Sequence, residues 1–183
     1  MSMPLTSYYS AEDVRALPDD GNRYETVHGE LLVTPAPGGK HQFVLGRLRY
    51  ALDTYLRAHG IEDLLVSPAD ISFGDDTLVQ PDLFVADLAG FTQTWRWSDI
   101  RTLYLSVEVL SPSSSRADRF TKRRLYQEQG VPTYWIVDLD QQLVEVWTPD
   151  ARFPVIERER LEWRHPGIAT PCSIELERLF AGG

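Results

Sequence analysis

The sequence has 183 residues, 43% of them hydrophobic and 25% charged, and a formal net charge of −9. These values are typical of a globular protein with a substantial core and argue against a disordered chain, and the length predicts one domain over residues 1–183. The negative net charge argues against a protein whose whole surface is basic and binds nucleic acid. The single cysteine, Cys172, excludes an intrachain disulfide and a cysteine-rich metal site.

The first part of the chain predicts a short helix, a hairpin and a long helix. The expected elements are Ser10–Leu17 (helix), Arg23–Val27 and Glu30–Thr34 (strands) and His41–His59 (helix). Ser10 is a suitable N-cap, and His28-Gly29 is typical of the turn between two strands. Apolar residues at helical spacing indicate the long helix, which Gly60 should end.

The rest of the chain predicts strands grouped around a second helix. The expected strands are Leu64–Val66, Ala69–Phe73, Thr77–Val85, Leu103–Leu110, Thr133–Asp138 and Leu143–Thr148. The helix is Arg116–Gln129, with Gly130 as its C-cap, and the tail from Ala151 should add one or two strands and a short helix near Leu176–Phe180. A helix between two groups of strands indicates a crossover, so we expect an α/β or α+β fold with a mixed sheet.

Glu108 is a carboxylate in the middle of an apolar strand. Side chains alternate along a strand, so Glu108 shares a face with Tyr104, Ser106 and Leu110. Glutamate is rarely buried unless it is paired with a cation or bound to a metal. This position therefore predicts a partner for Glu108.

Asp82 occupies a similar position in the preceding predicted strand. It lies among Pro81, Leu83 and Phe84. A proline inside a strand indicates an edge or a bulge, and bulges often redirect side chains near active sites. Two carboxylates on two central strands can converge on one hard cation, because Mg²⁺ prefers oxygen ligands.

Lys122 is the third candidate. The chain has only two lysines, Lys40 and Lys122, and the second lies in the predicted helix that follows Glu108. Asp118, Lys122 and Tyr126 fall on one face of that helix because they are four residues apart. If the helix crosses back over the sheet, Lys122 reaches the carboxylates.

The order of these motifs resembles one family of nucleases. Pro81-Asp82 followed by Glu108-Val109-Leu110-Ser111-Pro112-Ser113 resembles the PD-(D/E)XK superfamily. The further motifs are Arg23-Tyr24-Glu25 with Gly29-Glu30-Leu31, Pro35-Ala36-Pro37 with His41-Gln42, Gln80-Pro81-Asp82, Asp118 with Lys122 and Tyr126, and Gly130-Val131-Pro132 with Tyr134-Trp135-Ile136-Val137-Asp138. Together, from Tyr24 to Trp147, they are similar to the Uma-type restriction endonucleases.

The resemblance implies a restriction-endonuclease-like core, with a mixed sheet flanked by helices. It implies that Asp82 and Glu108 bind Mg²⁺ or Mn²⁺ and that a metal-bound water attacks a phosphodiester of DNA. The superfamily usually places lysine two residues after the glutamate, where this chain has Leu110. The family branch takes its lysine from the following helix, which corresponds to Lys122. By motif position, Glu25, His41, Gln42, Asp118 and Tyr126 are auxiliary candidates.

Each candidate also has a purely structural interpretation. Asp82 could be a strand-end residue bonded to backbone, and Glu108 could pair with a buried arginine. Lys122 could be a solvated helix residue with Asp118 as its partner four positions away, and His41 could be a structural histidine. Trp95 and Trp97 could stack on bases, although a packing or dimer-contact role is more common.

Two other functions compete with a metal-dependent endonuclease. A non-catalytic binding protein with the same fold is favoured by the acidic net charge and by Leu110. A glycoside hydrolase with two carboxylates would need neither lysine nor metal. The partners expected are nucleic acid, with DNA favoured, and a second copy of the chain, since two-fold dimers are the commonest oligomers.

The sequence also predicts where the protein resides. Residues 1–5 combine neither a basic flank nor a long apolar run, so we expect no signal peptide, and no apolar run is long enough to span a membrane. A cytoplasmic location and no membrane partner are therefore the expectation.

Overall fold

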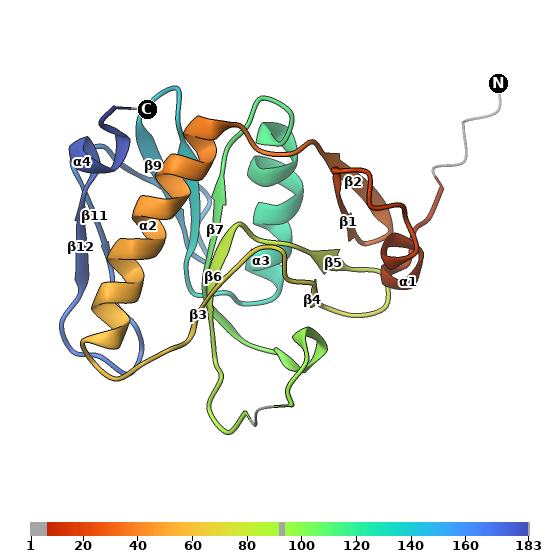
Figure 1. Ribbon diagram of the computed structural model, residues 1–183, viewed down its shortest axis with the longest axis horizontal. Helices are drawn as coiled ribbons and strands as arrows, with labels where there is room; N and C mark the ends of the chain where they lie inside the picture. The colour runs from red at the N-terminus through yellow and green to blue at the C-terminus, as the bar shows by residue number, and fades with distance from the viewer. Residues whose placement is uncertain (1–6, 92–93, 183) are drawn as a thin grey trace.

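A six-stranded mixed sheet lies at the centre of the computed structural model, which describes residues 7–91 and 94–182 (Figure 1). The strands in spatial order are β10 (Val155–Glu157), β9 (Leu143–Trp147), β8 (Tyr134–Asp138), β7 (Leu103–Val109), β6 (Leu83–Ala86) and β3 (Leu64–Val66). Among these strands, β7 and β8 form the only parallel pair. The predicted crossover between them is confirmed, because a helical segment connects the two.

That helical segment differs from a regular α-helix at its start. It opens as a π-helical stretch, η2 (Ala117–Lys122), and continues as α3 (Arg123–Glu128). The backbone N–H of Arg123 donates to the carbonyl of Asp118, five residues earlier. The predicted helix Arg116–Gln129 is therefore confirmed in place, but the regular geometry that we expected for its first turns is wrong.

A second sheet of four strands lies beside the first. Its order is β2 (Glu30–Thr34), β1 (Arg23–Val27), β5 (Leu78–Val79) and β4 (Ile71–Ser72). The hairpin β1–β2 has the predicted bounds, and its turn needs glycine because Gly29 has a positive φ and a Cβ there would overlap the ring of Tyr8. The short helix α1 (Ala11–Arg15) follows the predicted N-cap Ser10, which forms a capping box with Asp13.

The prediction of one strand from Thr77 to Val85 is wrong. The chain forms β5 in the small sheet, breaks at residues 80–82, and then forms β6 in the central sheet. Pro81 has no N–H to donate to a ladder, so the strand cannot continue through it. The predicted strand Ala69–Phe73 is likewise reduced to the two residues of β4.

Helices cover both faces of the central sheet, as expected. The long helix α2 (Gly39–Arg57) packs its apolar stripe against one face, where it forms one core with Leu83, Leu105 and Val107. On the other face, Leu125 and Tyr126 of α3 pack with side chains of β6 and β8. Figure 1 shows α2 and α3 on opposite sides of the sheet. The fold is mixed α+β.

The tail contains three strands rather than the one or two that we expected. β10 extends the central sheet, while β11 (Arg160–Trp163) and β12 (Cys172–Glu175) form a separate hairpin, followed by α4 (Leu176–Phe180). A short 3-10 helix, η1 (Trp97–Asp99), precedes β7. No helix within residues 7–91 and 94–182 is long and apolar enough to cross a membrane. Residues 1–5, where no signal peptide is expected, lie outside this range.

Candidate active site

Asp82 and Glu108 are neighbours across two adjacent strands. β6 and β7 are antiparallel, with Leu83 opposite Val107, so the next residues in this register are Asp82 and Glu108. The backbone N–H of Val109 donates to Asp82 Oδ2 at 2.8 Å. Asp82 is only 3% exposed and Glu108 is fully buried. The strand pairing therefore brings together the two carboxylates that the sequence singled out.

Lys122 lies among three carboxylates at this point. Its Nζ is 3.0 Å from Glu108 Oε1, 2.8 Å from Glu25 Oε2 and 3.4 Å from Asp118 Oδ1. The lysine is 1% exposed, which rules out the solvated interpretation. The π-helical turn that carries Asp118 and Lys122 faces the sheet, and such turns often occur at functional sites.

Glu25 reaches the same cluster from the small sheet. It lies in β1 and is fully buried, and its Oε1 accepts a hydrogen bond of 2.6 Å from the backbone N–H of Gln80. Because β5 ends just before Gln80, this bond ties the segment that precedes Asp82 to β1. The structure thus places the auxiliary candidate Glu25 in the ion cluster.

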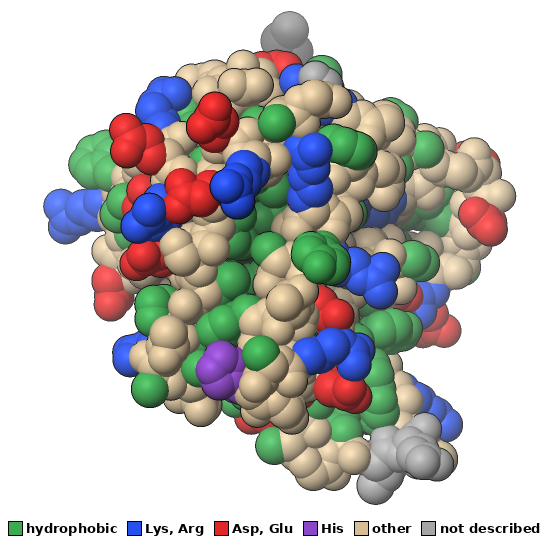
Figure 2. Space-filling view, turned by 60° about the vertical axis from the view of Figure 1, so that its left-hand side comes forward, with side chains coloured by type: hydrophobic (Ala, Val, Ile, Leu, Met, Phe, Trp, Pro, Cys, Tyr) green, Lys and Arg blue, Asp and Glu red, His purple; other side chains and the backbone are tan. Residues whose placement is uncertain are grey.

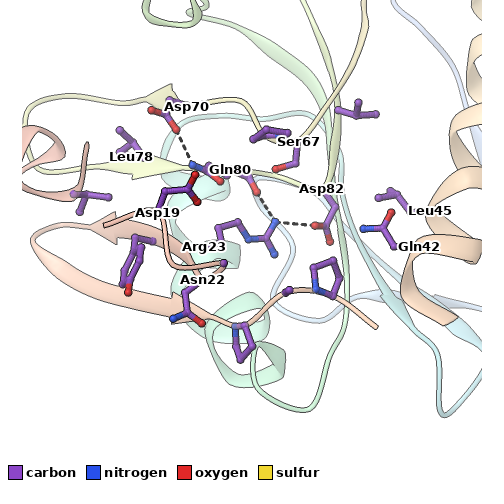
Figure 3. Close-up of a pocket in the computed structure, with 18 of the residues that line it drawn as sticks. Asp19, Asn22, Arg23, Gln42, Leu45, Ser67, Asp70, Leu78, Gln80 and Asp82 are labelled. Atoms are coloured by element: carbon purple, nitrogen blue, oxygen red, sulfur yellow. Dashed lines mark hydrogen bonds and ion pairs between the residues drawn. The ribbon is translucent and has the colours of Figure 1, made fainter. Parts of the chain in front are cut away.

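Arg23 is a member of the site that the sequence reasoning missed. Its Nη1 donates to Asp82 Oδ1 at 2.8 Å and to the carbonyl of Gln80 at 2.9 Å, and its Nε lies 3.9 Å from Glu25 Oε2. Figure 3 shows the guanidinium pointing at Asp82. Arg23 belonged to a quoted motif, but nothing in the local pattern of its strand distinguished it from a surface arginine.

His41 holds the second oxygen of Asp82. Its Nε2 lies 3.0 Å from Asp82 Oδ2, and the ring is buried at the start of α2. The candidate Gln42 follows it in the chain but is exposed and lines the cleft rather than the ion cluster. Tyr126 is fully buried on the face of the sheet that carries Glu108, with its ring centroid 4.7 Å from that of Tyr134.

Burial and charge shift the ionisation of this cluster in opposite directions. Burial raises the pKa of Glu108 well above its usual value, and the charges of Asp118 and Asp82 add to the effect of burial against the opposing charge of Lys122. Burial likewise raises the pKa of Asp118. Burial also acts on Asp82, but the His41 hydrogen bond and the Arg23 charge outweigh it and lower the pKa of that carboxyl.

The two cations remain charged. Burial lowers the pKa of Lys122, but the charges of Glu108, Glu25 and Asp118 outweigh that effect and hold it well above the usual value. Burial acts on Arg23 in the same way, and Glu108, Asp82 and Glu25 again raise its pKa. Both side chains therefore act as fixed positive charges near neutral pH.

The donor set suits a divalent cation bound with water. Four carboxylates face two permanent cations, so full ionisation leaves an excess of two negative charges. The buried atom Glu108 Oε2 has no hydrogen-bond partner. In the described part of the chain no three His, Cys, Asp or Glu side chains form a ready-made metal cage. Mg²⁺, however, commonly binds through one or two carboxylates and keeps several waters.

A cleft of about 850 Å³ opens beside Asp82 (Figure 3). Arg23 and Gln80 lie on one wall, and Gln42 projects from α2 on another. The cleft also contains Arg15 and Arg49. It therefore gives a solvent-borne molecule access to Asp82, whereas Glu108 lies deeper.

Basic residues are frequent between positions 116 and 124, on the helical segment after β7, but they do not form one free basic surface. Lys122 is buried, and Arg119 pairs with Asp138 and Glu145 at 2.6 and 2.7 Å. On the face shown in Figure 2, basic and acidic side chains are interspersed. The ring centroids of Trp95 and Trp97 lie 4.9 Å apart, and both rings pack against the core on the face of the central sheet that α3 covers. The two side chains therefore have a packing role.

Comparison with known proteins gives a family and a fold. The profile of the Uma2 family, described as "Putative restriction endonuclease", matches residues 11–174. The chain is also similar to a solved structure described as a putative nuclease belonging to DUF820, from Anabaena variabilis. The TM-score is 0.73 at 20% identity, over 94% of this chain and 97% of the other. Comparison with curated proteins found no match.

Proposed function

The chain belongs to the Uma2 family, and from this premise we propose that it is a metal-dependent endonuclease that hydrolyses phosphodiester bonds of DNA. Membership supports nuclease function in general. The metal, the DNA substrate, the PD-(D/E)XK site and the residue roles are the parts that we propose.

One observation carries the proposal: a buried lysine from the crossover helix contacts the carboxylate of the neighbouring strand. Lys122 Nζ lies 3.0 Å from Glu108 Oε1, and Glu108 lies opposite Asp82. A buried ion cluster of this kind is costly to desolvate, and ionisable groups with strongly shifted pKa values are concentrated at functional sites. This arrangement matches the roles that the family resemblance implies for Asp82, Glu108 and Lys122.

Asp82 and Glu108 would hold Mg²⁺ or Mn²⁺. Such an ion, when bound, would supply an activated water and neutralise charge on the phosphate. Asp82 faces the cleft and is kept ionised by its hydrogen bonds, so it is suited to contact a ligand that enters from solvent. Glu108 Oε2 has no hydrogen-bond partner, and this oxygen is the ligand atom that Glu108 would contribute to the metal.

Lys122 acts by its charge in this proposal. Three carboxylates keep it protonated, so it does not serve as a base at neutral pH. Lys122 does not line the cleft, so its ammonium would stabilise the negative charge that develops on the phosphate from within the buried cluster, where the low dielectric strengthens the effect. Glu25 and Asp118 hold the ammonium in place through their own ion pairs.

Calorimetric titration of Mg²⁺ and Mn²⁺ into the parent protein and into Asp82→Ala tests the metal site. We expect binding in the parent and none in the variant. A cleavage assay with DNA at low salt follows, with Lys122→Ala and a chelator as controls. Parent protein that neither binds metal nor cleaves DNA would overturn the proposal.

A non-catalytic nucleic-acid-binding protein is the second candidate. It is favoured by the protein groups that already hold the carboxylates, since Arg23, His41 and Val109 bond to both oxygens of Asp82. DNA binding without cleavage in any divalent metal would select this function. Hydrolysis of a glycoside at a rate that a chelator does not change would instead favour the glycoside hydrolase.

A further inference from the structure

The guanidinium of Arg23 holds the oxygen of Asp82 that faces the cleft. It bonds to Asp82 Oδ1 at 2.8 Å and lies near two further carboxylates, Glu25 and Glu108. Its side chain is 17% exposed, against 5% for Asp82. The guanidinium of Arg23 therefore occupies the cleft side of these carboxylates, where a metal cation entering from solvent would bind them.

Of the three groups bonded to Asp82, only Arg23 can leave. The N–H of Val109 is fixed in the backbone of β7. The ring of His41 is buried at the start of α2, and its side chain is 5% exposed. Arg23 has a long flexible side chain that lines the cleft, so it can turn toward solvent without disturbing a helix or a strand.

We propose that Arg23 exchanges partners: it holds Asp82 in the free protein and turns into the cleft to bind a phosphate of the substrate when the carboxylates take up a divalent cation. This inference rests on the proposed function and adds a phosphate-binding, positioning residue to it. A planar guanidinium suits the task because it binds carboxylate and phosphate with the same pair of donors.

The exchange couples the binding of metal to the binding of nucleic acid. Because Arg23 competes for Asp82, the apparent metal affinity equals the intrinsic affinity multiplied by the fraction of molecules in which Arg23 has left Asp82. A phosphate that attracts the guanidinium increases that fraction. Each ligand therefore strengthens the binding of the other by the same factor.

Titration of Mn²⁺, with and without a short phosphorothioate oligodeoxynucleotide that resists hydrolysis, measures this coupling. In the parent we expect the oligonucleotide to tighten Mn²⁺ binding about tenfold. In Arg23→Gln we expect Mn²⁺ to bind about tenfold more tightly than in the parent without the oligonucleotide, and the oligonucleotide to add less than about twofold.

Two variants guard against indirect effects. Arg15→Gln removes the same charge from the same cleft, but Arg15 pairs with Asp70 at 3.7 Å rather than with the site, so its coupling should match the parent. Arg23→Lys keeps a cation on Asp82 and should retain the parent's weak Mn²⁺ affinity. Thermal unfolding shows whether each variant is folded.

The outcomes separate this inference from the proposed function. Equal Mn²⁺ affinity in folded Arg23→Gln and in the parent overturns the exchange but leaves the metal site standing, provided that Asp82→Ala abolishes binding. Coupling that survives in Arg23→Gln also overturns it. Absence of Mn²⁺ binding in every protein overturns both.

Discussion

Lys122 Nζ donates a hydrogen bond of 3.0 Å to Glu108 Oε1, from a residue 14 positions further along the chain. Two residues after Glu108, just past the end of β7, the chain has the apolar and buried Leu110. The helix that returns between β7 and β8 thus supplies a cation that the strand lacks. The ammonium reaches the site because the parallel pairing of β8 with β7 requires a crossover on this face of the sheet.

Replacing Lys122 with methionine should strongly destabilise the protein. The change leaves the buried carboxylates Glu25, Glu108 and Asp118 without their shared cation. Removing one partner of a buried ion pair costs roughly 3–5 kcal/mol. Urea unfolding measures the loss, and Arg124→Met on the exposed side of α3 is the control, expected to stay within about 0.5 kcal/mol of the parent. A Lys122→Met protein as stable as this control would contradict the buried-cluster account.

The pH dependence of stability should change in Glu108→Gln. Burial raises the pKa of Glu108 above its ordinary 4.5, so above that pH the unfolded chain releases a proton that the folded protein still holds. The parent therefore loses free energy of unfolding as pH rises from 4.5 toward the raised pKa, and the Gln variant lacks this loss. The stability of the variant relative to the parent should therefore rise with pH above 4.5, as measured by urea unfolding over a pH series. A difference that is flat, or that falls with pH, would contradict a raised pKa.

Metal affinity should rise with pH for the same reason. A carboxyl that keeps its proton must release it before it binds a cation, so Mn²⁺ binding should be accompanied by proton release. Calorimetry in two buffers of different ionisation enthalpy measures the number of protons. The same titration over a pH series is the control, since the apparent Mn²⁺ affinity should rise with pH wherever protons are released. Binding of Mn²⁺ to the parent without proton release would show that Glu108 is ionised before the metal arrives.

DNA binding should depend on salt only through the few phosphate contacts that the cleft offers. Three arginines line the cleft, Arg15, Arg23 and Arg49, whereas Arg119 and Lys122 form ion pairs and are not among its lining residues. About 0.9 counterions are released per phosphate contact, which gives a slope of about −3 for log affinity against log salt concentration. Fluorescence anisotropy over a salt series tests this value. A slope twice as steep would mean that a basic surface outside the cleft contributes most of the contacts.

The sequence alone determined most of the elements near the site. Local signals were sufficient for the hairpin β1–β2, whose turn needs Gly29, and for α1, whose start needs Ser10. The alternation along β7 singled out Glu108 as a buried carboxylate that needed a partner. Such signals act over a few residues, so they can be read from the order of the side chains.

The tertiary structure decided what these side chains meet. Arg23 contacts a carboxylate 59 positions away, and no pattern within β1 distinguishes this arginine from an exposed one. The split of the expected strand at Pro81 likewise depended on a second sheet that could take β5. Local periodicity determines whether a side chain lies on the buried face of its strand or helix. The charge that the side chain faces depends on which distant segments pack against it. Burial makes an unpaired charge costly, and only the folded chain brings the partner charge into place.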